Sequence, residues 1–101
     1  MVKKSLRIVW DKKALKELEA ILEYINKESK SGARIVKTAI VETIKSLKKQ
    51  PYIFNADTLK DNNDNSYRAF IVYSYRISYK VTTEEVIILR VRHTSREPLP
   101  H

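Results

Sequence analysis

The chain has 101 residues, and its 20 Lys and Arg residues exceed its 12 Asp and Glu residues to give a formal charge of +8. The length fits one small domain, residues 1–101, with room for one core and one working surface. The hydrophobic share of 43% is too high for a disordered chain, and the absence of Cys excludes disulfides and thiolate metal sites. The cationic excess favours a polyanionic partner, and RNA, DNA machinery and an acidic protein all satisfy that requirement.

Targeting segments and cofactor motifs are not visible. The first 13 residues, MVKKSLRIVWDKK, have an apolar run too short and too interrupted for a signal peptide. No apolar segment approaches the roughly 18 residues of a membrane span. The sequence also lacks metal-ligand spacing, a glycine-rich phosphate loop and a nucleophile elbow. We therefore expect a cytoplasmic protein with no membrane association, no metal and no other cofactor.

The first predicted elements are one strand and two helices. Apolar residues alternate over residues 4–10, which predicts a short strand. Asp11 is a good N-cap for a helix over residues 12–28, and residues 29–32 break the helical pattern as a tight connection. A second helix is predicted over residues 33–49. Each helix has one apolar face, so the two form a helical hairpin.

The second half of the chain is predicted to be a loop followed by three strands. Residues 50–66 are rich in Asn and Asp, which favours a loop. The strands cover approximately residues 67–73, 75–81 and 86–93, and a hairpin turn joins the last two. The fold class is therefore α+β. An N-terminal strand, a helical hairpin and a three-strand antiparallel meander form one sheet with helices on one face.

Alternation sorts the strand side chains onto two faces of this sheet. The helix-facing side is expected to carry Tyr75, Ile77, Tyr79 and Val81 from the middle strand and Ile87, Leu89, Val91 and His93 from the last strand. The opposite side is expected to collect Arg76, Lys80, Arg90 and Arg92. Four cations on adjacent strands suit bidentate contacts to phosphates or carboxylates. The alternative is that they only keep an exposed sheet face soluble. For Arg68, on the preceding strand, the pattern leaves the face open.

Two residue types have competing interpretations. Tyr75 and Tyr79 are favoured as half-buried core residues, although tyrosines can also stack on bases. His93, at the end of the last strand, could serve as a general acid or base, or it could make a structural hydrogen bond. Arg76 is expected to be exposed, so that its loss would cost little stability.

The order of these patterns resembles that of the RelE/ParE toxin superfamily, closer to its ParE-like members. Residues 11–25 resemble that superfamily's DxxAxxxLxxIxxYI helix start, and Leu47 followed by Pro51 resembles the end of its second helix. Residues 75–81, YRISYKV, resemble its YRIxYxV strand. Residues 86–93, VIILRVRH, followed by Arg96, resemble its VxIxxVxHxR ending.

The resemblance implies the toxin of a bacterial type II toxin–antitoxin module for plasmid stabilisation, neutralised by a small acidic cognate antitoxin. ParE-like members inhibit DNA gyrase, and this is the favoured target. RelE-like members cleave mRNA on the ribosome as metal-independent endoribonucleases, and this is the alternative. A chromosomal relic that is no longer toxic is a third reading, and a homodimer also stays open.

Only some of the catalytic residues of RelE-like ribonucleases have counterparts in this chain. Arg76 matches the Arg that helps hold the scissile phosphate in RelE-like enzymes, and Arg68 falls near one of their catalytic Lys residues. Phe70 replaces a second Lys, and no C-terminal acid–base Tyr is present. His93 is placed like the His of some ribonuclease members, and equally like a non-catalytic His of ParE-like chains. The catalytic candidates are thus Arg68, Arg76 and His93. The candidates for binding the target or the antitoxin are Arg76, Lys80, Arg90, Arg92 and Arg96.

Overall fold

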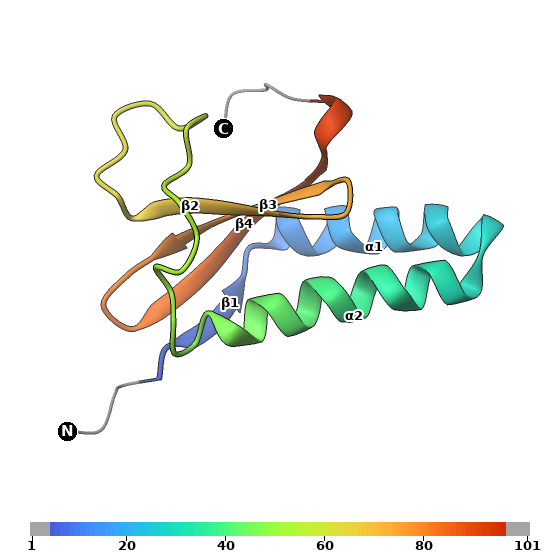
Figure 1. Cartoon of the computed structure of the whole chain (residues 1–101), viewed down its shortest axis with the longest axis horizontal. Coiled ribbons are helices and arrows are strands. Elements are labelled where there is room, and N and C mark those ends of the chain that lie inside the picture. Colours follow the sequence, from blue (N-terminus) through green and yellow to red (C-terminus); the bar gives the residue numbers. More distant parts are fainter. Residues whose placement is uncertain (1–4, 97–101) are drawn as a thin grey trace.

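The computed structural model describes residues 5–96, which form one four-stranded sheet and a helical hairpin (Figure 1). The elements are β1 (Arg7–Trp10), α1 (Lys12–Glu28), α2 (Lys30–Ser46), β2 (Tyr67–Val72), β3 (Tyr75–Val81) and β4 (Glu85–His93), and a 3-10 turn follows at Thr94–Arg96. The two helices lie side by side, and their far ends extend beyond the strands. This is the predicted α+β architecture.

The strand order is β1-β4-β3-β2. Strands β2, β3 and β4 form the predicted antiparallel meander, whereas β1 lies parallel to β4, with Arg7 opposite Glu85. The backbone N–H of Leu6 donates to the carbonyl of Lys48 at 2.9 Å, which fixes the start of β1 to the end of the helical hairpin. The first strand of the chain therefore forms one edge of the sheet, beside the last strand.

A single residue connects the two helices. The backbone N–H of Ser29 bonds to the carbonyl of Ile25 at the end of α1, and its side-chain oxygen accepts the N–H of Gly32 at 2.9 Å at the start of α2. Because Ser29 caps both helices, α2 begins at Lys30 rather than at residue 33, and Gly32 lies inside it. The predicted four-residue connection was wrong for this reason. At its other end α2 stops at Ser46, before a short turn.

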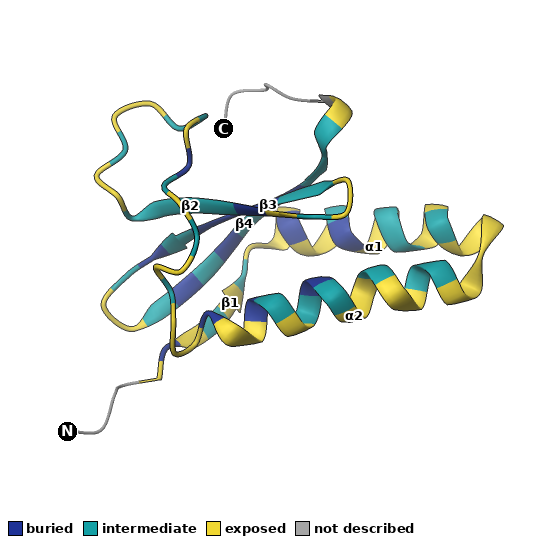
Figure 2. Ribbon diagram, in the orientation of Figure 1, coloured by how far each residue is buried: buried dark blue, intermediate teal, exposed yellow. Residues whose placement is uncertain are grey.

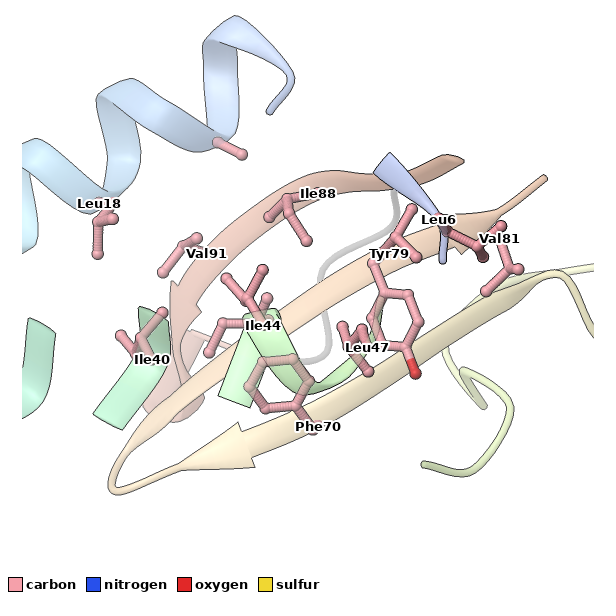
Figure 3. Packing of buried hydrophobic residues seen from close by; sticks show 13 residues of the cluster. Leu6, Leu18, Ile40, Ile44, Leu47, Phe70, Tyr79, Val81, Ile88 and Val91 are labelled. Carbon is pink, nitrogen blue, oxygen red and sulfur yellow. The ribbon is translucent and has the colours of Figure 1, made fainter. Parts of the chain in front are cut away.

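The core lies between the helices and one face of the sheet (Figure 3). Tyr79 is fully buried there, and its hydroxyl donates to the carbonyl of Pro51 at 2.9 Å. Tyr75 packs half-buried against the same cluster, so the core interpretation of both tyrosines is confirmed. The cluster's buried members are Leu6, Ala14, Leu18, Ile40, Ile44, Leu47, Phe70, Ile77, Tyr79, Val81, Val86, Ile88 and Val91.

A β-bulge in β4 changes the predicted faces of that strand. Ser78 lies opposite Arg90 and Tyr79 lies opposite Ile88, so Leu89 is an extra residue. Alternation shifts by one position there, and Ile88 is fully buried with Val91. The expectation that Ile87 and Leu89 share the helix-facing side with Val91 was therefore wrong.

The far half of the helical hairpin is only partly covered (Figure 2). The buried residues of α1 are Ala14 and Leu18, both in its first half. Further out, Tyr24 is 69% exposed and Ile35 is 54% exposed. In the part of the chain described, neither helix is long and apolar enough to cross a membrane.

Candidate partner-binding surface

Strand register directs the four predicted cations of β3 and β4 to the sheet face opposite the helices, but the guanidinium groups of Arg90 and Arg92 reach Glu17 of α1. Arg76 pairs in register with Arg92, Ser78 with Arg90, and Lys80 with Ile87. Residues opposite each other in an antiparallel pair point to the same face, and here it is the face opposite the buried Ile77 and Tyr79. The grouping of these cations follows directly from strand alternation, although their surroundings do not.

Arg76 is not exposed. Its guanidinium forms an ion pair with Asp57, and the side chains are 13% and 1% exposed. Asp57 is held by β2 and by its own loop, because its N–H donates to the carbonyl of Tyr67 at 2.8 Å and its carboxylate accepts the N–H of Leu59 at 2.9 Å. The expectation of an exposed Arg76 was therefore wrong. No spacing rule connects a loop Asp with a strand Arg 19 positions later.

Arg90 and Arg92 meet a carboxylate from α1. Glu17 accepts hydrogen bonds from the Arg90 guanidinium at 2.8 to 3.2 Å and lies 3.9 Å from the Nε of Arg92. It also accepts the backbone N–H of Val91 at 3.0 Å. Partial burial would raise the pKa of Glu17, but the hydrogen bonds from Arg90 and Val91 and the charges of Arg90 and Arg92 outweigh it and lower that pKa.

Sequence reasoning missed Glu17, although a signal for it was present. Glu17 lies three positions after the buried Ala14 and four before Ile21, which is the spacing of residues on one helix face. A carboxylate on the apolar face of a helix needs a buried partner. That partner is a sheet cation.

A groove of about 660 Å³ opens beside this ion-pair cluster. Its apolar side chains include Ile21 and Tyr24 from α1 and Tyr75 from β3, and its charged rim is formed by Arg90 and Arg92. The groove therefore combines apolar surface with cations, which suits a partner that carries both apolar and acidic side chains.

His93 forms the far end of the same groove. Its Nδ1 lies 2.8 Å from the hydroxyl of Ser95 and accepts the backbone N–H of Ser95 at 3.1 Å. Its ring makes an edge contact with the Tyr75 ring at 5.4 Å. His93 points to the helix-facing side of the sheet because it pairs in register with Tyr75. Arg76 points to the other side.

Arg68 anchors the loop that precedes β2. Its Nε donates to the carbonyl of Asn65 at 3.0 Å, its Nη1 donates to the carbonyl of Phe54, and its guanidinium lies 4.6 Å from the centre of the Tyr52 ring. Arg68 pairs in register with Tyr79, so it lies on the helix-facing side. The three candidate catalytic residues, Arg68, Arg76 and His93, therefore do not form a common site.

The remaining candidates are Lys80 and Arg96. The Lys80 ammonium lies 5.0 Å from the centre of the Tyr67 ring, and the Lys60 ammonium lies 4.7 Å from the same centre. The side chain of Arg96 lies outside the described part of the structure. Within residues 5–96, His, Asp and Glu residues do not cluster in a way that could hold a metal ion.

The fold is that of the RelE/ParE toxin superfamily. Over residues 8–98 the chain matches the family of the ParE toxin of the type II toxin–antitoxin system ParDE, and it therefore belongs to that family. Its class is that of a type II toxin. The comparison with curated proteins gives no match.

Two solved structures have the same fold. A chain of the chromosomal ParDE toxin–antitoxin system from P. aeruginosa is 21% identical, with a TM-score of 0.68 over 88% of this chain and 96% of that chain. A chain of the toxin–antitoxin complex RelBE2 from Mycobacterium tuberculosis is 17% identical, with a TM-score of 0.59 over 91% and 94% of the two chains. At these identities the likeness concerns the fold.

Proposed function

We propose that this toxin acts by binding DNA gyrase rather than by cleaving RNA, and that a small acidic antitoxin neutralises it. One observation carries the preference for binding. The candidate ribonuclease residues are dispersed, with Arg68 and His93 on the helix-facing side of the sheet and Arg76 on the other. RNA cleavage needs a proton acceptor beside the cations that hold the phosphate. The carboxylate beside Arg76 is that of Asp57, which is buried and engaged with Arg76 itself.

The groove beside Glu17 is the proposed antitoxin site. Acidic side chains of the antitoxin would meet Arg90 and Arg92, and its apolar side chains would cover Tyr24. Two relatives of the same fold belong to the ParDE and RelBE toxin–antitoxin systems, which supports a partner of this kind. The uncovered far half of the hairpin also supports it, because exposed apolar surface marks an interaction site.

The experiment compares substitutions of two exposed tyrosines. Tyr24 lies in the groove and is 69% exposed, whereas Tyr73 is 65% exposed and is not part of the groove lining. The antitoxin is the acidic product of the adjacent gene, and its affinity is measured by titration. We expect Tyr24→Ala to weaken binding at least tenfold, because truncating an aromatic anchor costs roughly 1.4 kcal/mol or more, and Tyr73→Ala to change it less than twofold. Equal affinities for the two variants would contradict this site.

A further inference from the structure

Helix α2 carries a row of cations that the proposed antitoxin site does not use. Lys30, Arg34, Lys37 and Lys45 lie on the helix and Lys48 follows in the turn after it, all of them exposed. Their spacing of four, three, eight and three residues places them along one side of the helix. At 1.5 Å per residue this α2 basic row is about 27 Å long.

Helix α2 has far fewer carboxylates to offset its cations than the neighbouring helix α1 has. Helix α1 carries four Lys and four Glu residues, whereas α2 carries four cations and Glu42 as its one carboxylate. Glu42 lies 3.6 Å from Lys45, and both side chains are more than 60% exposed. Within the described residues, Lys30, Arg34, Lys37 and Lys48 form no ion pair. The positive potential along this side of α2 is therefore not cancelled locally.

The side chains of the row favour duplex DNA over a protein or a single-stranded nucleic acid as its partner. Protein interfaces are centred on apolar or aromatic anchors, but the exposed apolar side chain of α2, Ile35, lies off the row. Single-stranded nucleic acids need aromatic side chains for base stacking, and the row has none. A straight line of cations on a rigid helix instead suits the phosphates of a duplex. The wide major groove of B-form DNA accepts a helix, unlike the narrow major groove of RNA.

We propose that the α2 basic row binds the phosphate backbone of double-stranded DNA without sequence preference. The row is long enough to follow about 8 base pairs at 3.4 Å each. This inference does not depend on whether gyrase or mRNA is the target, because none of the row's residues belongs to the groove or to the outer sheet face.

The test compares two triple variants of the full chain. Arg34→Gln, Lys37→Gln and Lys45→Gln change the row, and Lys13→Gln, Lys16→Gln and Lys27→Gln change exposed positions of α1. Both variants lower the formal charge of +8 by three units, and Gln is a good helix former. Binding to a random-sequence 20-base-pair duplex is measured over a series of salt concentrations, and circular dichroism checks that both variants fold. Duplex RNA and polyglutamate serve as competitors.

We expect the α2 variant to bind DNA at least tenfold more weakly than the native chain. The slope of log affinity against log salt should fall in magnitude by about 2 to 3, because each lost phosphate contact removes about 0.9. The α1 variant should bind within threefold of the native chain. Equal losses in the two variants would overturn the proposal, since net charge alone would then account for binding. No DNA binding by the native chain, or stronger competition by RNA or polyglutamate than by DNA, would also overturn it.

Discussion

Glu17 shows how one side chain can complete a sheet edge. Strand β1 ends at Trp10, so β4 loses its neighbour beyond Ile88. The N–H of Val91 would then lack a strand partner, and the Glu17 carboxylate accepts it from the adjoining helix. The same carboxylate neutralises Arg90. One carboxylate thus both accepts the free backbone N–H of Val91 and balances the charge of Arg90.

This coupling predicts a pH-dependent loss of stability in Glu17→Gln. We expect the variant to lose about 1.5–3 kcal/mol of unfolding free energy at neutral pH, the usual contribution of hydrogen bonds to a charged group. The pKa of Glu17 is lowered in the folded state. Its charge therefore stabilises the protein above the ordinary pKa of Glu, and this stabilisation is lost as the pH falls through the lower folded pKa.

Urea unfolding at pH 7 and at a series of acidic pH values tests this prediction, because the stabilisation by the Glu17 charge is lost as the pH falls through the lowered folded pKa. The difference between native chain and variant should shrink in acid. Glu19→Gln, at an exposed position of the same helix, is the control and should match the native chain. A difference that stays equally large down to the lowest pH at which the native chain is folded would contradict the role of the charge.

The buried Arg76–Asp57 pair predicts a large effect of Arg76→Ala. Removing the guanidinium leaves much of the buried Asp57 charge uncompensated, which typically costs about 3–5 kcal/mol. The double variant Arg76→Met with Asp57→Asn should recover part of that loss, because neither partner is then charged. Thermal unfolding measures both. A loss below about 1 kcal/mol, the level of an exposed pair, would show that the pair is not buried in solution.

The second half of the loop of residues 50–66 is held by hydrogen bonds between the Asn63 side chain and the backbone of residues 57, 65 and 67. Asn63 donates to the carbonyls of Tyr67 at 2.7 Å and Asp57 at 3.2 Å, and it accepts the N–H groups of Tyr67 and Asn65. Asn65 has a φ of 77°, which Asn tolerates better than most residues. The loop is therefore an ordered element, and it positions Asp57 over the sheet.

We predict that Asn63→Ala loosens this loop. Four hydrogen bonds are lost at a half-buried position, so the unfolding free energy should fall by about 1–3 kcal/mol. Amide hydrogen exchange over residues 57–67 should accelerate, while exchange in β3 and β4 changes little. Asn55→Ala, at an exposed position of the same loop, is the control. Unchanged exchange in the Asn63 variant would contradict the anchoring role.

How far the sequence predicts each element depends on the range of the interactions that define it. The helices and the meander follow from local periodicity, which is strong in both. The bulge at Leu89 could not be predicted, because the residues on both faces of β4 are apolar before it. The extra residue is visible only through the pairing of β4 with β3. The Asp57–Arg76 pair depends on the path of a whole loop. Glu17 was predictable from its place on the apolar helix face, but its Arg partner was not.

At the scale of the whole molecule, the cations fall into two sets with different surroundings. Asp57 compensates Arg76 on the outer sheet face, and Glu17 of α1 compensates Arg90 at the edge of β4. In the α2 basic row, Lys30, Arg34, Lys37 and Lys48 have no ion pair in the described structure, and they face solvent. The groove beside Glu17 lies between the sheet and α1, where exposed apolar surface meets the compensated Arg residues. The antitoxin and DNA are therefore proposed for different sides of the molecule.

The central claim is inhibition by binding, and gyrase supercoiling with purified components tests it most directly. The chain is added to gyrase and relaxed plasmid with and without the antitoxin, while mRNA ends are mapped in cells that express it. The α2 triple variant is assayed in parallel, so that coating of the plasmid cannot be mistaken for inhibition. We predict that supercoiling is lost with both the native chain and this variant, that the antitoxin restores it, and that no new mRNA ends form. Unchanged supercoiling, together with new mRNA ends inside codons that disappear in His93→Gln, would contradict the account and identify the chain as a ribonuclease.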